Sequence, residues 1–171
     1  MAEANKIFTV GLLGGDRAGI STLLDFIAGV AKRGGAGGRT GYGCEIRMKG
    51  VELRLVETHL RDFERGRPAA DCWYLVVDAG EGIGALGPDF RAMGIERVEG
   101  IFLAKCDLID YDDDIIELEK IDARSCFYEN GLPEDCGVFI AGSVFRAMDG
   151  ERGAGVDAVA GLLQSIVSHI P

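Results

Sequence analysis

The fold is decided by residues 6–33, which read KIFTVGLLGGDRAGISTLLDFIAGVAKR. The first nine residues are mostly apolar and end in glycine, and apolar residues then recur at helical spacing over residues 20–33. This pattern predicts a strand, a glycine-rich turn and a helix. The turn nearly matches the phosphate-binding pattern G-x-x-x-x-G-K-S/T, because Gly14, Gly19 and Ser21 fall on its glycine and hydroxyl positions. Ile20 stands where the pattern has lysine.

Apolar strands and helices continue to alternate after this unit. Strands are expected at residues 72–80, 101–108 and 137–144, a hairpin at 44–58, and helices at 114–128 and 155–170. Residues 60–69 are expected to form a short polar helix or loop. Residues 31–43 hold six glycines and are expected to form a mobile loop. The alternation predicts an α/β fold with a six-stranded, mostly parallel sheet and one antiparallel edge strand.

Composition and charge narrow the class of protein. The 171 residues are 47% hydrophobic, which suits one packed domain over residues 1–171. Neither a long apolar run nor a basic leader is present, so a cytoplasmic protein with no membrane contact is expected. Five dispersed cysteines without a C-x-x-C pair predict reduced, mostly buried thiols. Residues 1–67 carry a net charge of +3 and residues 68–171 carry −13, so a polyanion would contact the N-terminal part.

The carboxyl ends of the strands are where α/β sheets bind ligands. At the first end, the glycines allow backbone N–H groups to face a phosphate, and the Ser21 hydroxyl can hold a magnesium ion. A glycine-rich turn without a ligand would have a similar sequence. Lys105 and Asp107 follow a later apolar strand, where a carboxylate can accept two hydrogen bonds from guanine while the lysine stem packs along the base. Small residues around Ser143 allow the backbone to approach a base closely.

On these strand ends, and on the segments DCWYLVVDAGEG (71–82), FLAKCDLID (102–110) and IAGSVFRAMDGE (140–151), the chain resembles the G domain of the translational GTPases. That family comprises elongation factor Tu and its relatives. Because its first switch region, residues 31–43, is short, the chain looks most like the divergent archaeal branch that includes selenocysteine-specific and pyrrolysine-associated elongation factors. The resemblance implies a three-layer P-loop NTPase sandwich that forms a single G domain or the N-terminal domain of a longer elongation factor. It further implies GTP or GDP with Mg²⁺ as cofactors, and the ribosome or tRNA as partners.

Carried over residue by residue, the resemblance assigns Ser21 and Glu57 to the metal. It assigns nucleotide binding to nine residues, which are Gly14, Asp16, Gly19, Ser21, Thr22, Lys105, Asp107, Ser143 and Val144.

The chain departs from the family on the phosphate side. Ile20 replaces the lysine of the loop, and residues 57–60, ETHL, replace the family's D-x-x-G. Arg61 stands where the family has its catalytic histidine, Thr40 is the single threonine of the short region 31–43, and Ala104 replaces the asparagine of N-K-x-D. No catalytic residue is therefore expected.

These departures predict a degenerate G domain with weak or absent guanine-nucleotide binding and little or no GTP hydrolysis. The alternatives are a functional GTP-binding elongation factor domain with divergent motifs, or a nucleotide-independent scaffold for a protein partner. The substitution Ile20→Lys is expected to raise nucleotide affinity if the loop keeps a phosphate-binding shape.

Overall fold

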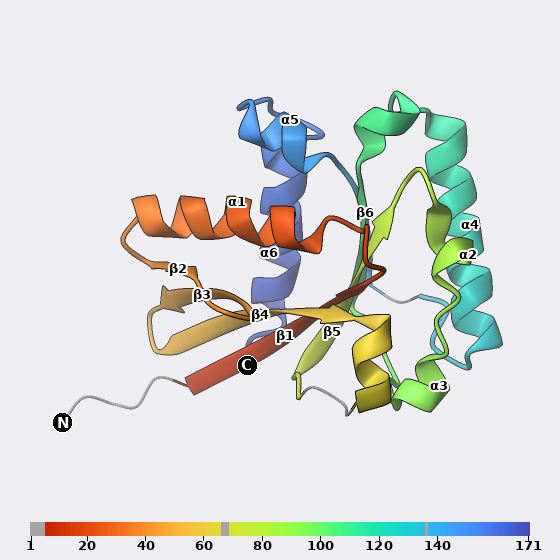
Figure 1. Ribbon diagram of the computed structural model, residues 1–171, viewed down its shortest axis with the longest axis horizontal. Helices are drawn as coiled ribbons and strands as arrows, with labels where there is room; N and C mark the ends of the chain where they lie inside the picture. The colour runs from red at the N-terminus through yellow and green to blue at the C-terminus, as the bar shows by residue number, and fades with distance from the viewer. Residues whose placement is uncertain (1–5, 66–68, 136) are drawn as a thin grey trace.

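A computed structural model describes residues 6–65, 69–135 and 137–171 (Figure 1). Its strands form one seven-stranded sheet in the order β2-β3-β4-β1-β5-β6-β7. Their bounds are β1 Lys6–Gly14, β2 Gly37–Arg39, β3 Gly43–Met48, β4 Val51–His59, β5 Cys72–Asp78, β6 Gly100–Ala104 and β7 Val138–Ala141. The α-helices are α1 Ile20–Arg33, α2 Gly82–Leu86, α3 Phe90–Met93, α4 Asp113–Glu129, α5 Val144–Met148 and α6 Val156–Ser168, and the 3-10 helices are η1 Leu60–Arg65 and η2 Cys106–Ile109.

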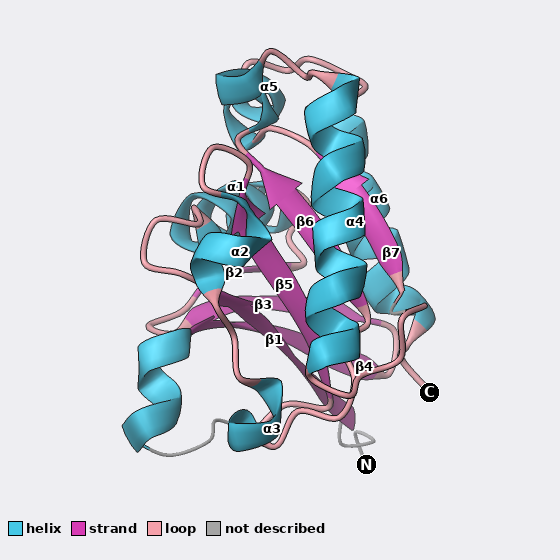
Figure 2. Ribbon diagram, turned by 90° about the vertical axis from the view of Figure 1, so that its right-hand side faces the viewer, coloured by secondary structure: helices cyan, strands magenta, loops and turns pink. Residues whose placement is uncertain are grey.

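The sheet lies between two layers of helices, as the two views together show (Figures 1 and 2). Side chains of α1, α5 and α6 pack with Val10 and Leu12 of β1 in one hydrophobic cluster. Side chains of α2, α3 and α4 pack with Leu13 and with Trp73 of β5 in the other. Because successive strand residues point to opposite faces, adjacent positions of β1 belong to different clusters. The molecule is therefore an α/β sandwich with a core on each side of the sheet.

Five strands run in the same direction, namely β1, β4, β5, β6 and β7. Their carboxyl ends therefore meet at one edge of the sheet. The turns that follow Gly14, His59, Asp78, Ala104 and Ala141 lie along this edge. The sequence prediction that places the candidate site residues near one another depends on this arrangement.

The predicted α/β class and mostly parallel sheet are confirmed, but the strand count and the edge are wrong. Residues 31–43 were expected to contain a mobile loop without regular structure, whereas Gly37–Arg39 form the edge strand β2. The antiparallel strand β3 consequently lies between β2 and β4. A Cβ atom built on Gly37 would lie 1.9 Å from the carbonyl oxygen of Glu45, so the close pairing of β2 with β3 requires glycine.

Other boundaries differ by smaller amounts. The strand expected at 101–108 ends at Ala104, because Cys106–Ile109 turn into η2. The segment expected at 137–144 contains β7 and the first residue of α5. Residues 60–65 form η1, and residues 66–68 of the segment expected at 60–69 lie outside the described residues.

The cysteine prediction holds for the thiols that the structure describes. Cys44, Cys72 and Cys106 are buried and free, and Cys126 is half-buried and free. Cys136 lies outside the described residues. Burial raises the pKa of Cys106 to about 11, so this thiol stays protonated and unreactive near neutral pH. Among the described residues, no helix combines the length and apolar character needed to cross a bilayer.

The buried Tyr74 side chain should make the stability of the fold depend on alkaline pH. The ring is fully buried, its Oη lies 2.7 Å from Ser165 Oγ, and burial raises its pKa from 10.0 to about 12. Burial also raises the pKa of Cys72 to about 12. Because each group ionises first in the unfolded chain, stability is complete below the unfolded pKa and falls as pH rises towards 12. We expect a loss on the order of 1 kcal/mol per pH unit for each group.

Urea unfolding between pH 8 and pH 11.5 measures this loss. In Tyr74→Phe the fall above pH 10 should be shallower, because one of the buried groups that ionise there has been removed. An identical slope in the variant and the wild type would contradict the assignment to Tyr74.

Candidate functional site

Two side chains of the turn after β1 are buried against the core. Ala18 and Ile20 are 3% and 2% exposed and belong to the hydrophobic cluster under α1. A Cβ atom built on Gly14 would lie 2.9 Å from Ala18 Cβ and 3.1 Å from Ile20 Cδ1. The N–H group of Ala18 donates to the carbonyl of Gly15 within the turn, at 3.1 Å. Apolar atoms of Ala18 and Ile20 therefore lie against the turn at Gly14, and the side chain that stands in place of the pattern's lysine belongs to the core.

Gly19 ends this turn with a left-handed backbone, at φ 86°, and precedes the first residue of α1. This conformation favours glycine, and it accounts for the second glycine of the sequence pattern. The side chain of Lys105 passes beside it, with Cε 3.5 Å from the position of a Cβ atom on Gly19. That distance is an ordinary contact, so the left-handed backbone, and not the approach of Lys105, is what favours glycine here.

Lys105 joins three of the strand ends. Its Nζ donates to Asp78 Oδ2 at 2.7 Å and to the backbone carbonyl of Arg17. The Asp78 side chain is only 10% exposed, and its other oxygen accepts a hydrogen bond from the N–H group of Gly80. Lys105 itself has a positive φ of 61°. A residue other than glycine keeps this backbone conformation only when the surrounding structure holds it there. A buried ion pair of this kind fixes the position of the lysine across the turn.

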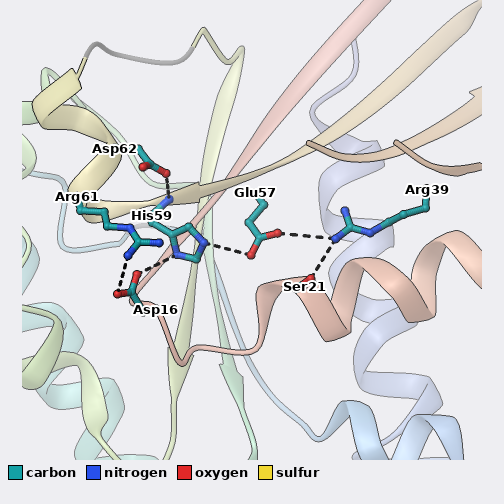
Figure 3. Close-up of polar contacts among 7 residues, drawn as sticks. All are labelled: Asp16, Ser21, Arg39, Glu57, His59, Arg61 and Asp62. Carbon is teal, nitrogen blue, oxygen red and sulfur yellow. Dashed lines mark hydrogen bonds and ion pairs between the residues drawn. The ribbon is translucent and has the colours of Figure 1, made fainter. Parts of the chain in front are cut away.

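A chain of polar contacts crosses the mouth of the turn (Figure 3). Asp16 lies 3.2 Å from Arg61 Nη1 and 3.6 Å from His59 Nδ1. His59 Nε2 lies 3.2 Å from Glu57 Oε1, and Glu57 Oε2 lies 3.8 Å from Arg39 Nη2. These contacts connect the turn after β1 with the end of β4 and with β2. Side chains of the protein therefore occupy the region in which the sequence predicts phosphate and metal.

The predicted metal ligands Ser21 and Glu57 both contact Arg39. Ser21 Oγ accepts a hydrogen bond from Arg39 Nη2 at 3.0 Å, and the same nitrogen is the atom that faces Glu57. Nowhere in the described part of the chain do three or more His, Cys, Asp or Glu side chains form a group suited to a metal. The two predicted ligands do come together, but a guanidinium lies between them.

The turn at residues 105–111, after β6, keeps polar groups that lack partners. Asp107 Oδ1 is buried without a hydrogen bond inside the protein. The buried Tyr111 hydroxyl lies beside that of Ser143, at a geometry that falls short of a hydrogen bond. Burial raises the pKa of Tyr111, the Ser143 hydroxyl opposes this rise, and the Asp107 carboxylate adds to it. Asp110 and Tyr111 also have positive φ values, so the turn is held in an uncommon conformation. Buried polar atoms without partners are what a ligand or an ordered water would satisfy.

Ser143 and Val144 lie beside this turn at the start of α5. Ser143 is fully buried, and its Oγ accepts a hydrogen bond from the N–H group of Arg146 at 3.3 Å. The N–H group of Cys106 donates to the carbonyl of Gly142 at 3.1 Å, which ties the two turns together. The structure therefore brings Asp107, Ser143 and Val144 to one end of the edge. Ser143 acts there as a helix cap.

A cavity of about 260 Å³ borders the turn after β1 on the side of α2. Its walls include apolar atoms of Leu60, Val77 and Leu86, and its charged side chains are Asp16, Arg61, Asp78 and Glu81. Each of the three carboxylates lies near a cation, because Asp16 pairs with Arg61, Asp78 with Lys105 and Glu81 with Arg17. The charged groups of this wall are therefore already engaged with one another.

The other residues predicted to bind nucleotide lie farther from the contacts described above. Asp16 is exposed and bound to Arg61, and Thr22 lines a separate groove with Phe26 and Met148. The sequence prediction did not place Asp78 or Arg39 in the nucleotide or metal site, and it considered Arg39 only as one of several basic residues that could contact a polyanion. A carboxylate at the carboxyl end of a buried strand was a signal for Asp78, whereas nothing local in the glycine-rich segment indicated what Arg39 contacts.

No protein-family model matches the sequence.

Proposed function

We propose that the chain is a degenerate G domain of the translational-GTPase type, which does not hydrolyse GTP and binds guanine nucleotides weakly or not at all. The observation that carries the proposal is the burial of Ala18 and Ile20 in the turn after β1, where both side chains pack against Gly14. The sheet order also supports it, because it places the five parallel carboxyl ends at one edge.

Hydrolysis of GTP needs a cation on the phosphates, a magnesium ion and a positioned water molecule. In this chain an isoleucine replaces the lysine and its side chain is buried. Arg39 contacts the two residues proposed for magnesium, and Arg61, which replaces the histidine, is paired with Asp16. The cation on the phosphates, the magnesium site and the group that positions water are therefore all without their usual residues. The proposed activity is weak binding, if any, without turnover.

A second candidate is a nucleotide-independent scaffold that binds a protein partner. The packed turn favours it, because a site that never takes up a phosphate has no need for open space there. If the chain is instead part of an elongation factor, its proposed partners are the ribosome or tRNA. In either case the proposed location is the cytoplasm, and the proposed cofactor is at most weakly bound GTP or GDP with Mg²⁺.

Calorimetric titration with GDP and GTP, with and without Mg²⁺, tests the proposal. We expect dissociation constants weaker than about 10 µM that do not change with Mg²⁺, and no phosphate release from GTP. A dissociation constant at or below about 1 µM that depends on Mg²⁺ would overturn it. Absence of binding at about 1 mM of either nucleotide would favour the scaffold.

The variant Asp107→Ala separates base recognition from non-specific binding. If weak GDP binding uses the unpartnered Asp107 carboxylate, this change should abolish it. Asp110→Ala is the matched control, because Asp110 is an exposed acid of the same turn. An equal loss of binding in both variants would show that charge alone, and not the Asp107 contact, is responsible.

A further inference from the structure

Arg39 is bound on every side of its guanidinium. Nε donates to Asp25 Oδ1 at 2.7 Å, Nη1 donates to the carbonyl of Gly43 at 2.8 Å, and Nη2 donates to Ser21 Oγ at 3.0 Å. The nearest oxygen of Glu57 lies 3.8 Å from Nη2. These four groups come from α1, from the start of β3 and from β4, and all of their contacting atoms are oxygens. Hard oxygen ligands of this type also suit Mg²⁺ and Mn²⁺.

The arrangement does not fit a magnesium ion between Ser21 and Glu57. A metal there would have to displace Nη2, which contacts both residues, and its positive charge would lie beside that of the guanidinium. Displacing Arg39 would also break its bonds to Asp25 and to Gly43. Strand β2 consists of two glycines and Arg39, so Arg39 supplies the only side chain that can hold this strand against α1.

We propose that Arg39 is the resident cation of this site, where its guanidinium holds Ser21, Asp25 and Glu57 together and keeps divalent cations out. The inference rests on the proposed function in one respect, since Ser21 and Glu57 are the residues that the family resemblance assigns to magnesium. If Arg39 has this role, the side chains of Ser21, Asp25 and Glu57 are held together without a metal ion. Strand β2 is then held on the sheet by a group that the protein always carries.

Titration with Mn²⁺, followed by electron paramagnetic resonance of the free ion, tests this directly without nucleotide. The wild type should bind no Mn²⁺ at this site at about 1 mM. Arg39→Ala frees two carboxylates and a hydroxyl, and it should bind one Mn²⁺ at least tenfold more tightly than the wild type. Arg39→Gln removes the charge but keeps much of the side-chain volume, so it provides the same test if the alanine variant folds poorly.

Two further variants test whether any Mn²⁺ gained is bound at the Arg39 site. Arg54→Ala is the matched control, because Arg54 also bridges two carboxylates of the same sheet, those of Glu45 and Glu52, and its removal should add no binding. Adding Glu57→Gln to Arg39→Ala should remove the Mn²⁺ gained.

Two results would overturn the proposal. One is stoichiometric Mn²⁺ binding by the wild type that is lost in Glu57→Gln, and the other is no gain of binding in either Arg39 variant. Nucleotide is absent throughout, so such a failure leaves the nucleotide titration proposed above unaffected.

Discussion

Ile20→Lys is expected to destabilise the protein by about 3–5 kcal/mol at pH 7, because a buried lysine must remain neutral or force the core open. Ile20 is 2% exposed, and its Cδ1 lies against the turn at Gly14. The sequence alone suggests a different outcome, in which lysine at this position restores a contact to phosphate. In the structure, however, residue 20 lies in the hydrophobic core, so the substitution places a lysine among apolar side chains.

Urea unfolding at several pH values measures the effect. A lysine buried in its neutral form binds fewer protons than the lysine of the unfolded chain, so the deficit in stability should shrink as pH rises from 7 towards 10. Ile20→Met is the control, since it keeps the site apolar at similar volume and should cost less than about 1.5 kcal/mol. If Ile20→Lys is as stable as Ile20→Met and binds GDP more tightly than the wild type, the turn can open to phosphate and the inference drawn from the burial of Ile20 is wrong.

Much of the fold follows from the period of the apolar residues. Strand β1 and helix α1 begin and end at the residues predicted, because the switch from a continuous apolar run to helical spacing coincides with glycines on both sides of the turn. The two ends of the site that lie next to such strands, at Gly14 and at Asp107, were predicted for the same reason. In each case an apolar strand fixes where the polar residues after it must lie.

Strand β2 could not be predicted, because the property that identifies it is non-local. Glycine-rich sequence lowers the propensity for regular structure, yet Gly37 is needed where the backbone of β2 approaches that of Glu45. The role of Arg39 follows from the same placement. Its partners on α1 and β4 are distant in the sequence, at residues 21, 25 and 57, and only the pairing of β2 with β3 brings them together.

Gly11→Ala is the second substitution with a large expected effect. A Cβ atom at residue 11 would lie 2.3 Å from both Cε3 and Cζ3 of Trp73, on the neighbouring strand β5. The indole is rigid and 4% exposed, so it must move within a packed core to make room. We expect a loss of about 3 kcal/mol, measured by urea unfolding with the fluorescence of Trp73, the chain's single tryptophan.

The matched control is Gly29→Ala in α1, where the nearest atom to a new Cβ is Arg33 Nη1 at an ordinary 3.6 Å. This change should stabilise the protein by up to about 1 kcal/mol, because alanine favours a helix more than glycine does. A smaller ring should relieve the clash, so Gly11→Ala combined with Trp73→Phe should lose less stability than the two single losses added together, with unfolding followed by far-UV circular dichroism because these variants lack the tryptophan. Strict additivity would mean that residue 11 does not press on the indole, and the packing of β1 against β5 would then need another explanation.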